Sequence, residues 1–166
     1  MELTTERLQI RPVTVEALVA AVEGPAALGR LWDMAVVDDF PGEDFRPVVP
    51  ILLAHATEHP AILHYTGFIA HRADRAVIGT IGCHAPPDGD GAVEIGYQVD
   101  AGYRRRGLAT EALHALCAWA EAEPLVRRLD ARSLPENEPS RRMLARAGFA
   151  LEGLGDDGFL VWRRPT

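Results

Sequence analysis

The sequence contains no lysine, only two cysteines and no long apolar run, and each of these absences excludes a class of protein. All 17 basic residues are arginines, and with 24 acidic residues the net charge is −7. This acidic balance argues against non-specific nucleic-acid binding, which needs a broad positive surface. Two cysteines make neither a disulfide framework nor a zinc cluster. Because Cys83 and Cys117 lie among apolar residues, we expect buried free thiols in a reducing compartment.

No segment has the length and hydrophobicity of a membrane span, and residues 1–7 carry charge where a secretory signal would be apolar. We therefore expect a cytoplasmic protein without a membrane partner. The composition, 48% hydrophobic and 25% charged, is that of a globular domain. No linker or repeat divides the chain, so residues 1–166 are expected to form a single domain.

Hydrophobic periodicity predicts helices and strands in a mixed order. Helices are expected over 15–23, over 108–121, and from the turn at 135–140 to Gly148; strands are expected over 8–11, 64–71, 76–83, 92–99, 127–132, 149–154 and 159–163. The secondary-structure pattern is weakest over residues 26–60, where one or two helices around an acidic loop are expected. The pattern as a whole predicts an α/β or α+β layered domain.

One segment, Arg104-Arg105-Arg106-Gly107-Leu108-Ala109-Thr110, joins a predicted strand to a predicted helix. Gly107 has no Cβ, so the backbone can approach a ligand closely. The amides of a helix's first turn have no partner inside the helix, and the helix dipole favours an anion there. These features indicate a phosphate site, with a solvated basic turn as the alternative. No Gly-Lys-Ser/Thr follows, which excludes a nucleotide-triphosphate P-loop.

Three motifs in this order resemble those of one known family. They are Thr4-Thr5-Glu6-Arg7-Leu8-Gln9-Ile10-Arg11-Pro12; Glu94-Ile95-Gly96-Tyr97 followed by Arg104-x-x-Gly107-x-Ala109-Thr110-Glu111-Ala112; and Asn137-x-x-Ser140-x-x-x-Leu144-x-x-x-Gly148-Phe149. With them the chain resembles the GCN5-related N-acetyltransferases, most closely the branch of the ribosomal-protein N-terminal alanine acetyltransferases. Arg105-Arg106 stands where Gly-Lys is commoner, a change that keeps positive charge in the loop.

The resemblance implies a mixed, mostly antiparallel twisted sheet flanked by helices, with a central strand pair that splays apart. It implies acetyl-CoA as cosubstrate and no metal. The residues it assigns to acetyl-CoA are Tyr97, Gln98, Val99, Arg104, Arg105, Arg106, Gly107, Leu108, Ala109, Thr110 and Asn137. The loop amides would hold the pyrophosphate, and the strand end would hold the pantetheine arm. Gly96 is expected at a bulge or at a close approach of another group, with a glycine that has no such role as the alternative.

The implied reaction moves an acetyl group to a primary amine, either a small amine or a protein N-terminus. An ammonium must lose a proton before it attacks the thioester, and the departing thiolate needs a proton donor. Glu94 is the candidate base, with a solvated or paired glutamate as the alternative. Ser140 is the candidate acid by the family motif, with a capping hydroxyl as the alternative. Tyr97 and Tyr103 are weaker acid candidates.

Acceptor contacts are expected within residues 26–60. The acidic loop there, residues 38–44, has the four carboxylates of Asp38, Asp39, Glu43 and Asp44, which would attract a cationic amine or simply be solvated. Trp32 and Phe40 would wall the acceptor pocket or belong to the core. Whether the protein is a monomer or a homodimer is left open by the sequence.

Two other functions fit parts of the sequence. His55-Ala56-Thr57-Glu58-His59 matches the H-x-x-E-H pattern of inverted zinc metallopeptidases. Pro60 follows directly and disfavours helical geometry at His59, so the two histidines are not expected to share a helical face. The second alternative is an acetyl-CoA-binding module without turnover. The remaining histidines, at positions 64, 71, 84 and 114, show no ligand spacing and are expected on strand or helix surfaces.

Overall fold

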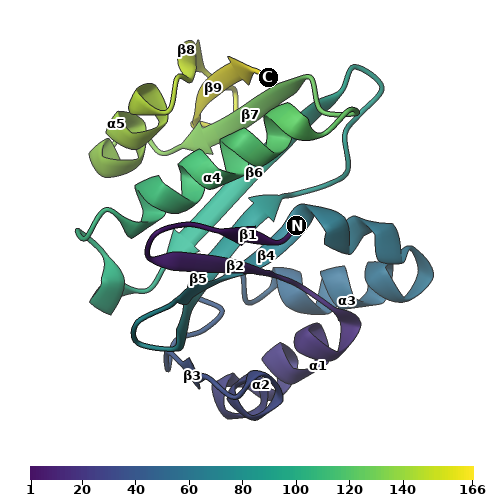
Figure 1. Cartoon of the computed structure of the whole chain (residues 1–166). Helices are drawn as coiled ribbons and strands as arrows, with labels where there is room; N and C mark the ends of the chain where they lie inside the picture. The colour runs from purple at the N-terminus through teal and green to yellow at the C-terminus, as the bar shows by residue number, and fades with distance from the viewer.

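A sheet of nine strands forms the centre of the computed structural model, which describes residues 1–166 (Figure 1). Eight strands follow the order β1-β2-β4-β5-β6-β7-β9-β8, and β3 pairs with β5 off this path. The strands are β1 (Leu3–Thr4), β2 (Leu8–Pro12), β3 (Ala35–Val36), β4 (Thr66–His71), β5 (Ala76–Cys83), β6 (Ala92–Val99), β7 (Arg128–Ser133), β8 (Ala150–Leu154) and β9 (Leu160–Pro165). Only the β6–β7 and β3–β5 pairs are parallel, so the predicted mixed, mostly antiparallel sheet is confirmed.

Helices cover both faces of this sheet. They are α1 (Val15–Glu23), α2 (Pro25–Trp32), α3 (Val48–Glu58), α4 (Leu108–Ala122) and α5 (Glu138–Arg146), with 3-10 turns η1 (Pro60–Tyr65) and η2 (Ala101–Tyr103). Phe68 and Val77 face the cluster built by α1, α2 and α3, whereas Ile69 and Ile78 face the cluster of α4. All residues of β5 are buried, as expected of a strand covered on both faces. None of the helices has both the length and the apolar character that crossing a membrane requires.

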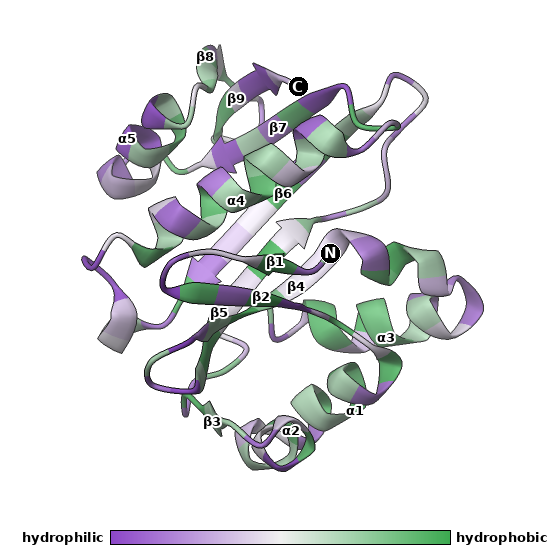
Figure 2. Cartoon of the chain, in the orientation of Figure 1, coloured by the Kyte–Doolittle hydropathy of each residue, from purple (hydrophilic) through white to green (hydrophobic).

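Local sequence signals account for most of the element boundaries. The Thr14 side chain accepts a hydrogen bond from the Ala17 amide and so begins α1, and Gly148, with φ of +86°, follows the end of α5. Figure 2 shows apolar and polar residues alternating along α4, as expected of a helix that packs by one face. The predicted strand start at residue 64 was wrong: β4 begins at Thr66, because residues 60–65 form η1 after Pro60.

The central strands β6 and β7 separate along their length. Ala92 to Ile95 pair with Arg128 to Ala131, and the pairing ends there. Beyond that point β7 pairs only with β9, up to Ser133, and β6 continues to pair only with β5, up to Val99. The main chain of residues 96–99 therefore presents an edge without a strand neighbour on the β7 side. The predicted splayed pair is confirmed.

Candidate functional site

A cavity of about 590 Å³ opens where β6 and β7 diverge, between β6, the start of α4 and the start of α5. Its lining comprises Asp44, Tyr97, Gln98, Val99, Tyr103, Arg104, Arg105, Gly107, Leu108, Ala109, Thr110, Asn137, Pro139, Ser140 and Met143. Ten of the eleven residues expected to hold acetyl-CoA are among them. The exception is Arg106, whose guanidinium lies 5.1 Å from the Tyr103 ring centre. We call this space the slot cavity.

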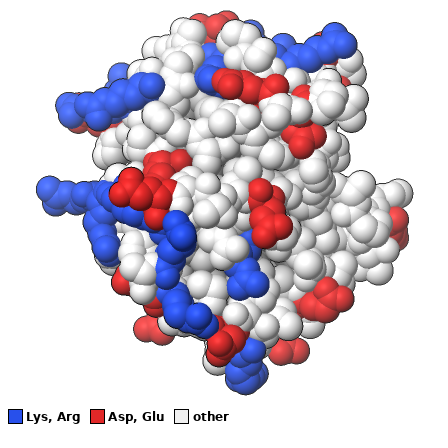
Figure 3. All heavy atoms as spheres, in the orientation of Figure 1, with Lys and Arg blue, Asp and Glu red and all other residues white.

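The loop before α4 has the backbone shape of an anion site. Gly107 precedes the helix with φ of +76°, and Arg105 also adopts a left-handed φ of +61°. Alternation of left-handed and ordinary residues turns successive amides toward one side, which makes a concave seat for an anion. Figure 3 shows basic side chains gathered on the side of the molecule where this loop lies. The Arg104 side chain is engaged locally, because its Nε donates to the Val99 carbonyl at 2.9 Å.

The N-terminal segment holds this loop in place through hydrogen bonds, a role that was not predicted from the sequence. Arg7 Nε donates to the Glu111 carboxylate at 2.7 Å, and Arg7 Nη1 donates to the Arg106 carbonyl at 2.8 Å. The Thr5 hydroxyl also donates to Glu111. Partial burial favours the neutral form of Glu111, but these hydrogen bonds outweigh it, so the pKa of the carboxyl lies below its usual range. The sequence did contain one signal for this contact, because Arg7 and Glu111 each belong to one of the family motifs.

Two hydroxyl groups meet inside the slot cavity. The Tyr97 hydroxyl and Ser140 Oγ lie 2.9 Å apart. Burial raises the pKa of Tyr97, with the hydrogen bond to Ser140 opposing it, so the phenol keeps its proton at neutral pH. Asn137 Oδ1 accepts from the Ser140 amide at 3.2 Å, which leaves the capping role to Asn137 and the Ser140 hydroxyl to the cavity. Tyr103 donates its hydroxyl proton to Asp74 at 3.0 Å and is therefore committed elsewhere.

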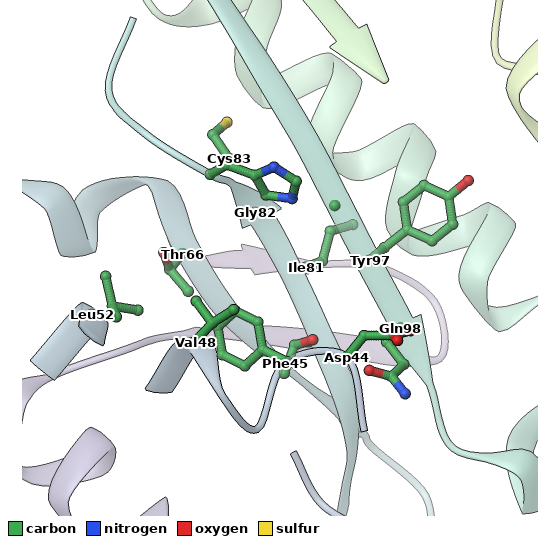
Figure 4. A pocket seen from close by; sticks show the side chains of 13 residues that line it. Asp44, Phe45, Val48, Leu52, Thr66, Ile81, Gly82, Cys83, Tyr97 and Gln98 are labelled. Carbon is green, nitrogen blue, oxygen red and sulfur yellow. The ribbon is translucent and has the colours of Figure 1, made fainter. Parts of the chain in front are cut away.

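A second cavity of about 440 Å³ lies on the other side of β6 and is called here the acceptor cavity. Figure 4 shows Phe45, Val48 and Leu52 on one side and the strand residues Ile81 and Tyr97 on the other. Asp44, Tyr97 and Gln98 line both cavities, so the two spaces meet at these residues. Gln98 Oε1 is buried there without a hydrogen-bond partner. A buried acceptor of this kind is costly unless a ligand satisfies it.

The acidic loop contributes one carboxylate to these cavities. Asp44 lines both of them, whereas Asp39 forms an ion pair with Arg46 at 2.8 Å. Phe40 is a core residue and the partly buried Trp32 packs against the core, with ring centres 4.9 and 5.6 Å from that of the buried Phe68.

The candidate base Glu94 lines neither cavity and is paired on both sides. Its Oε1 lies 3.3 Å from His84 Nδ1, and its Oε2 lies 3.3 Å from Arg132 Nε. His84 is exposed, as expected, and it also lines the acceptor cavity. His71, which was also expected on the surface, is instead buried. Pairing with β5 runs through Gly96 without a register shift, so Gly96 marks a close approach rather than a bulge in that pairing.

The cysteines and the remaining histidines offer no competing chemistry. Cys83 and Cys117 are free and buried. Burial raises the pKa of the Cys83 thiol to about 12, so the thiolate that a nucleophile requires is scarce at neutral pH. His59 has left α3, with φ of −132°, so His55 and His59 do not share a helical face. No three His, Cys, Asp or Glu side chains are grouped closely enough to hold a metal ion.

Comparison with known proteins agrees with this geometry. The family model described as an acetyltransferase (GNAT) domain matches residues 7–150. The uncharacterised N-acetyltransferase YjdG of Bacillus subtilis is 26% identical over 150 residues, 90% of this chain and 89% of the relative. The [ribosomal protein uS5]-alanine N-acetyltransferase of Escherichia coli is 33% identical over 75 residues, 43% of this chain and 39% of the relative. RimL, the ribosomal L7/L12 α-N-protein acetyltransferase in complex with coenzyme A, superposes with a TM-score of 0.71 at 16% identity, over 99% of this chain and 98% of that chain. The resemblance indicated by the three motifs is confirmed.

Proposed function

Because the chain belongs to the GNAT family and is an acyl-CoA-dependent N-acetyltransferase, we propose that it transfers the acetyl group of acetyl-CoA directly to a primary amine. The acceptor is a protein N-terminus or a small amine. The observation that carries the proposal is the meeting of the two cavities at Asp44, Tyr97 and Gln98. A thioester in the slot cavity and an amine in the acceptor cavity would face each other there, as a direct displacement requires.

The slot cavity has the groups that acetyl-CoA needs. The amides around Gly107 and the first turn of α4 would take the diphosphate, and the unpaired edge of residues 96–99 would take the amide-rich arm as an added strand. The same edge would offer amides to the tetrahedral oxyanion. The raised pKa of Cys83 argues for direct transfer over an acetyl-cysteine intermediate.

Ser140 and Tyr97 are proposed to protonate the leaving thiolate. Their hydroxyls lie 2.9 Å apart in the slot cavity, so Ser140 can give its proton to sulfur and regain one from Tyr97. Glu94 is proposed to assist removal of the amine proton, from its place beside the acceptor cavity.

The acceptor cavity favours an amine attached to an apolar group. Phe45, Val48 and Leu52 give it an apolar wall, and Asp44 adds a negative charge where the two cavities meet. A cation with a hydrophobic neighbour, such as the first residue of a polypeptide, satisfies both features. The similarity to acetyltransferases of ribosomal proteins supports a protein N-terminus as the acceptor.

A screen of acetylation across an amine panel, with detection of the released thiol, tests this function. The panel would contain peptides with different N-terminal residues, free amino acids and simple alkylamines. We expect thiol release with at least one amine and formation of the N-acetyl product by mass spectrometry. Tight binding of acetyl-CoA without thiol release for any amine would instead support a non-catalytic acetyl-CoA-binding module.

A further inference from the structure

His84 directly follows β5 and reaches the acceptor cavity over a glycine of the next strand. An ideal Cβ on Gly96 would lie 2.5 Å from His84 Nε2, closer than real Cβ contacts allow. The imidazole therefore occupies space that any other residue at position 96 would fill. The side chain of His84 is 61% exposed, so its ring is open both to the cavity and to solvent.

The other ring nitrogen faces an anchored carboxylate. His84 Nδ1 lies 3.3 Å from Glu94 Oε1, and Arg132 is at the same distance from Glu94 Oε2. Arg132 is itself paired with Asp157. A carboxylate beside Nδ1 favours the tautomer that carries its proton there, which leaves Nε2 as a proton acceptor. Both oxygens of Glu94 are thus engaged, whereas Nε2 of His84 lies over Gly96, and both His84 and Gly96 line the acceptor cavity.

We propose that His84 is the catalytic base that takes the proton from the acceptor ammonium, and that Glu94 is the positioning residue that orients it. This inference rests on the proposed function, because it needs an amine in the acceptor cavity. The ammonium nitrogen loses two protons as the C–N bond forms and the C–S bond breaks. One goes to His84 Nε2 and then to solvent. The other leaves the nitrogen as the tetrahedral intermediate collapses and, through solvent, replaces the proton that the Ser140–Tyr97 pair gives to the departing sulfur.

The direct test is His84→Ala, assayed with an amine that the parent enzyme acetylates. Loss of a general base should lower kcat by roughly 10² to 10⁴-fold. The affinity for acetyl-CoA should stay within about a factor of three, because His84 does not line the slot cavity. Added imidazole should restore part of the rate by entering the space vacated over Gly96. His114→Ala is the matched control, because His114 is exposed on α4 and lines neither cavity.

Further variants separate catalysis from folding. Gly96→Ala should displace the imidazole and lower kcat with the fold retained. Gly89→Ala is the control and should leave kcat unchanged, because a Cβ there meets nothing within 4 Å.

Glu94→Gln should slow the reaction less than His84→Ala does. The double variant of positions 84 and 94 should be no slower than His84→Ala alone, since Glu94 acts through His84.

A His84→Ala enzyme with kcat within about a factor of three of the parent would overturn the assignment. A Glu94→Gln enzyme slower than His84→Ala would return the role of base to Glu94. These outcomes are distinct from failure of the proposed function, in which the unaltered enzyme releases thiol with no amine.

Discussion

Replacement of Gly107 by alanine isolates the phosphate-binding role of one main-chain position. Gly107 has φ of +76°, and a Cβ placed there would meet only Arg7 Nη2, at an ordinary contact distance of 3.5 Å. A left-handed conformation costs a residue with a Cβ about 1–2 kcal/mol. The smaller entropy of the unfolded alanine chain returns about 0.4–1 kcal/mol of this. The net loss of about 1 kcal/mol should lower Tm by roughly 2–4 °C.

The loss of ligand affinity should be larger than the loss of stability. A Cβ at this position should keep a diphosphate from approaching the loop amides as closely as glycine allows. A hydrogen bond to a charged group contributes about 1.5–3 kcal/mol. Loss of a single one should weaken acetyl-CoA binding by roughly ten- to a hundredfold at about 1.4 kcal/mol per decade. Isothermal titration calorimetry measures this Kd, and a thermal melt of the same sample measures the strain.

Gly158→Ala is the matched control. Gly158 has φ of +83°, its Cβ would meet nothing within 4 Å, and it lies in the turn between β8 and β9. Both variants should therefore lose similar Tm, and only Gly107→Ala should lose affinity. The reasoning would be refuted by a Gly107→Ala protein that melts like Gly158→Ala and binds acetyl-CoA as tightly as the parent.

Three further outcomes follow from the same geometry. Ser140→Ala should lower kcat by roughly 10² or more while changing the Kd of acetyl-CoA far less; an effect confined to Kd, seen by calorimetry, would place Ser140 in binding alone. Glu111→Gln should cost about 2 kcal/mol of unfolding free energy at neutral pH. The pKa of Glu111 is lower in the folded protein than its unfolded value of 4.5, so the stabilisation is present above pH 4.5 and is lost as pH falls through the folded pKa. The urea midpoints of variant and parent should therefore converge in acid. A difference between the midpoints that does not change with pH would contradict this role of Glu111. Arg105→Gly should relieve the left-handed φ and raise the unfolding free energy by up to about 1 kcal/mol in urea denaturation, whereas a fall would contradict the strain.

Elements defined by nearby residues could be predicted from the sequence almost to the residue. Helix α1 has its cap at Thr14 and its stop at Gly24, both within a residue of its ends, and β5 was predicted with its observed bounds. Strand β3 could not be predicted, because a two-residue strand exists only through pairing with Ala76 and Val77, some forty positions later in the chain. Its stabilisation comes from distant partners that leave no local pattern.

The site divides in the same way. The loop around Gly107 could be predicted from the sequence because its function depends on consecutive amides. The position of His84 could not be predicted, because it depends on the Glu94 carboxylate and on the missing Cβ of Gly96, both on another strand. Asp44 was singled out only as one of four acidic residues, because loop geometry decides which carboxylate reaches the cavities.

The early end of the β6–β7 pairing has a mechanical consequence. Four residue pairs tie the β1–β6 half of the sheet to the β7–β9 half, all at one end of the strands. A pantetheine chain lying in the opening would contact both halves and connect them where the strands do not pair. Occupancy by the thioester should therefore stiffen the molecule as a whole, and resistance to heat should climb with ligand concentration as mass action dictates.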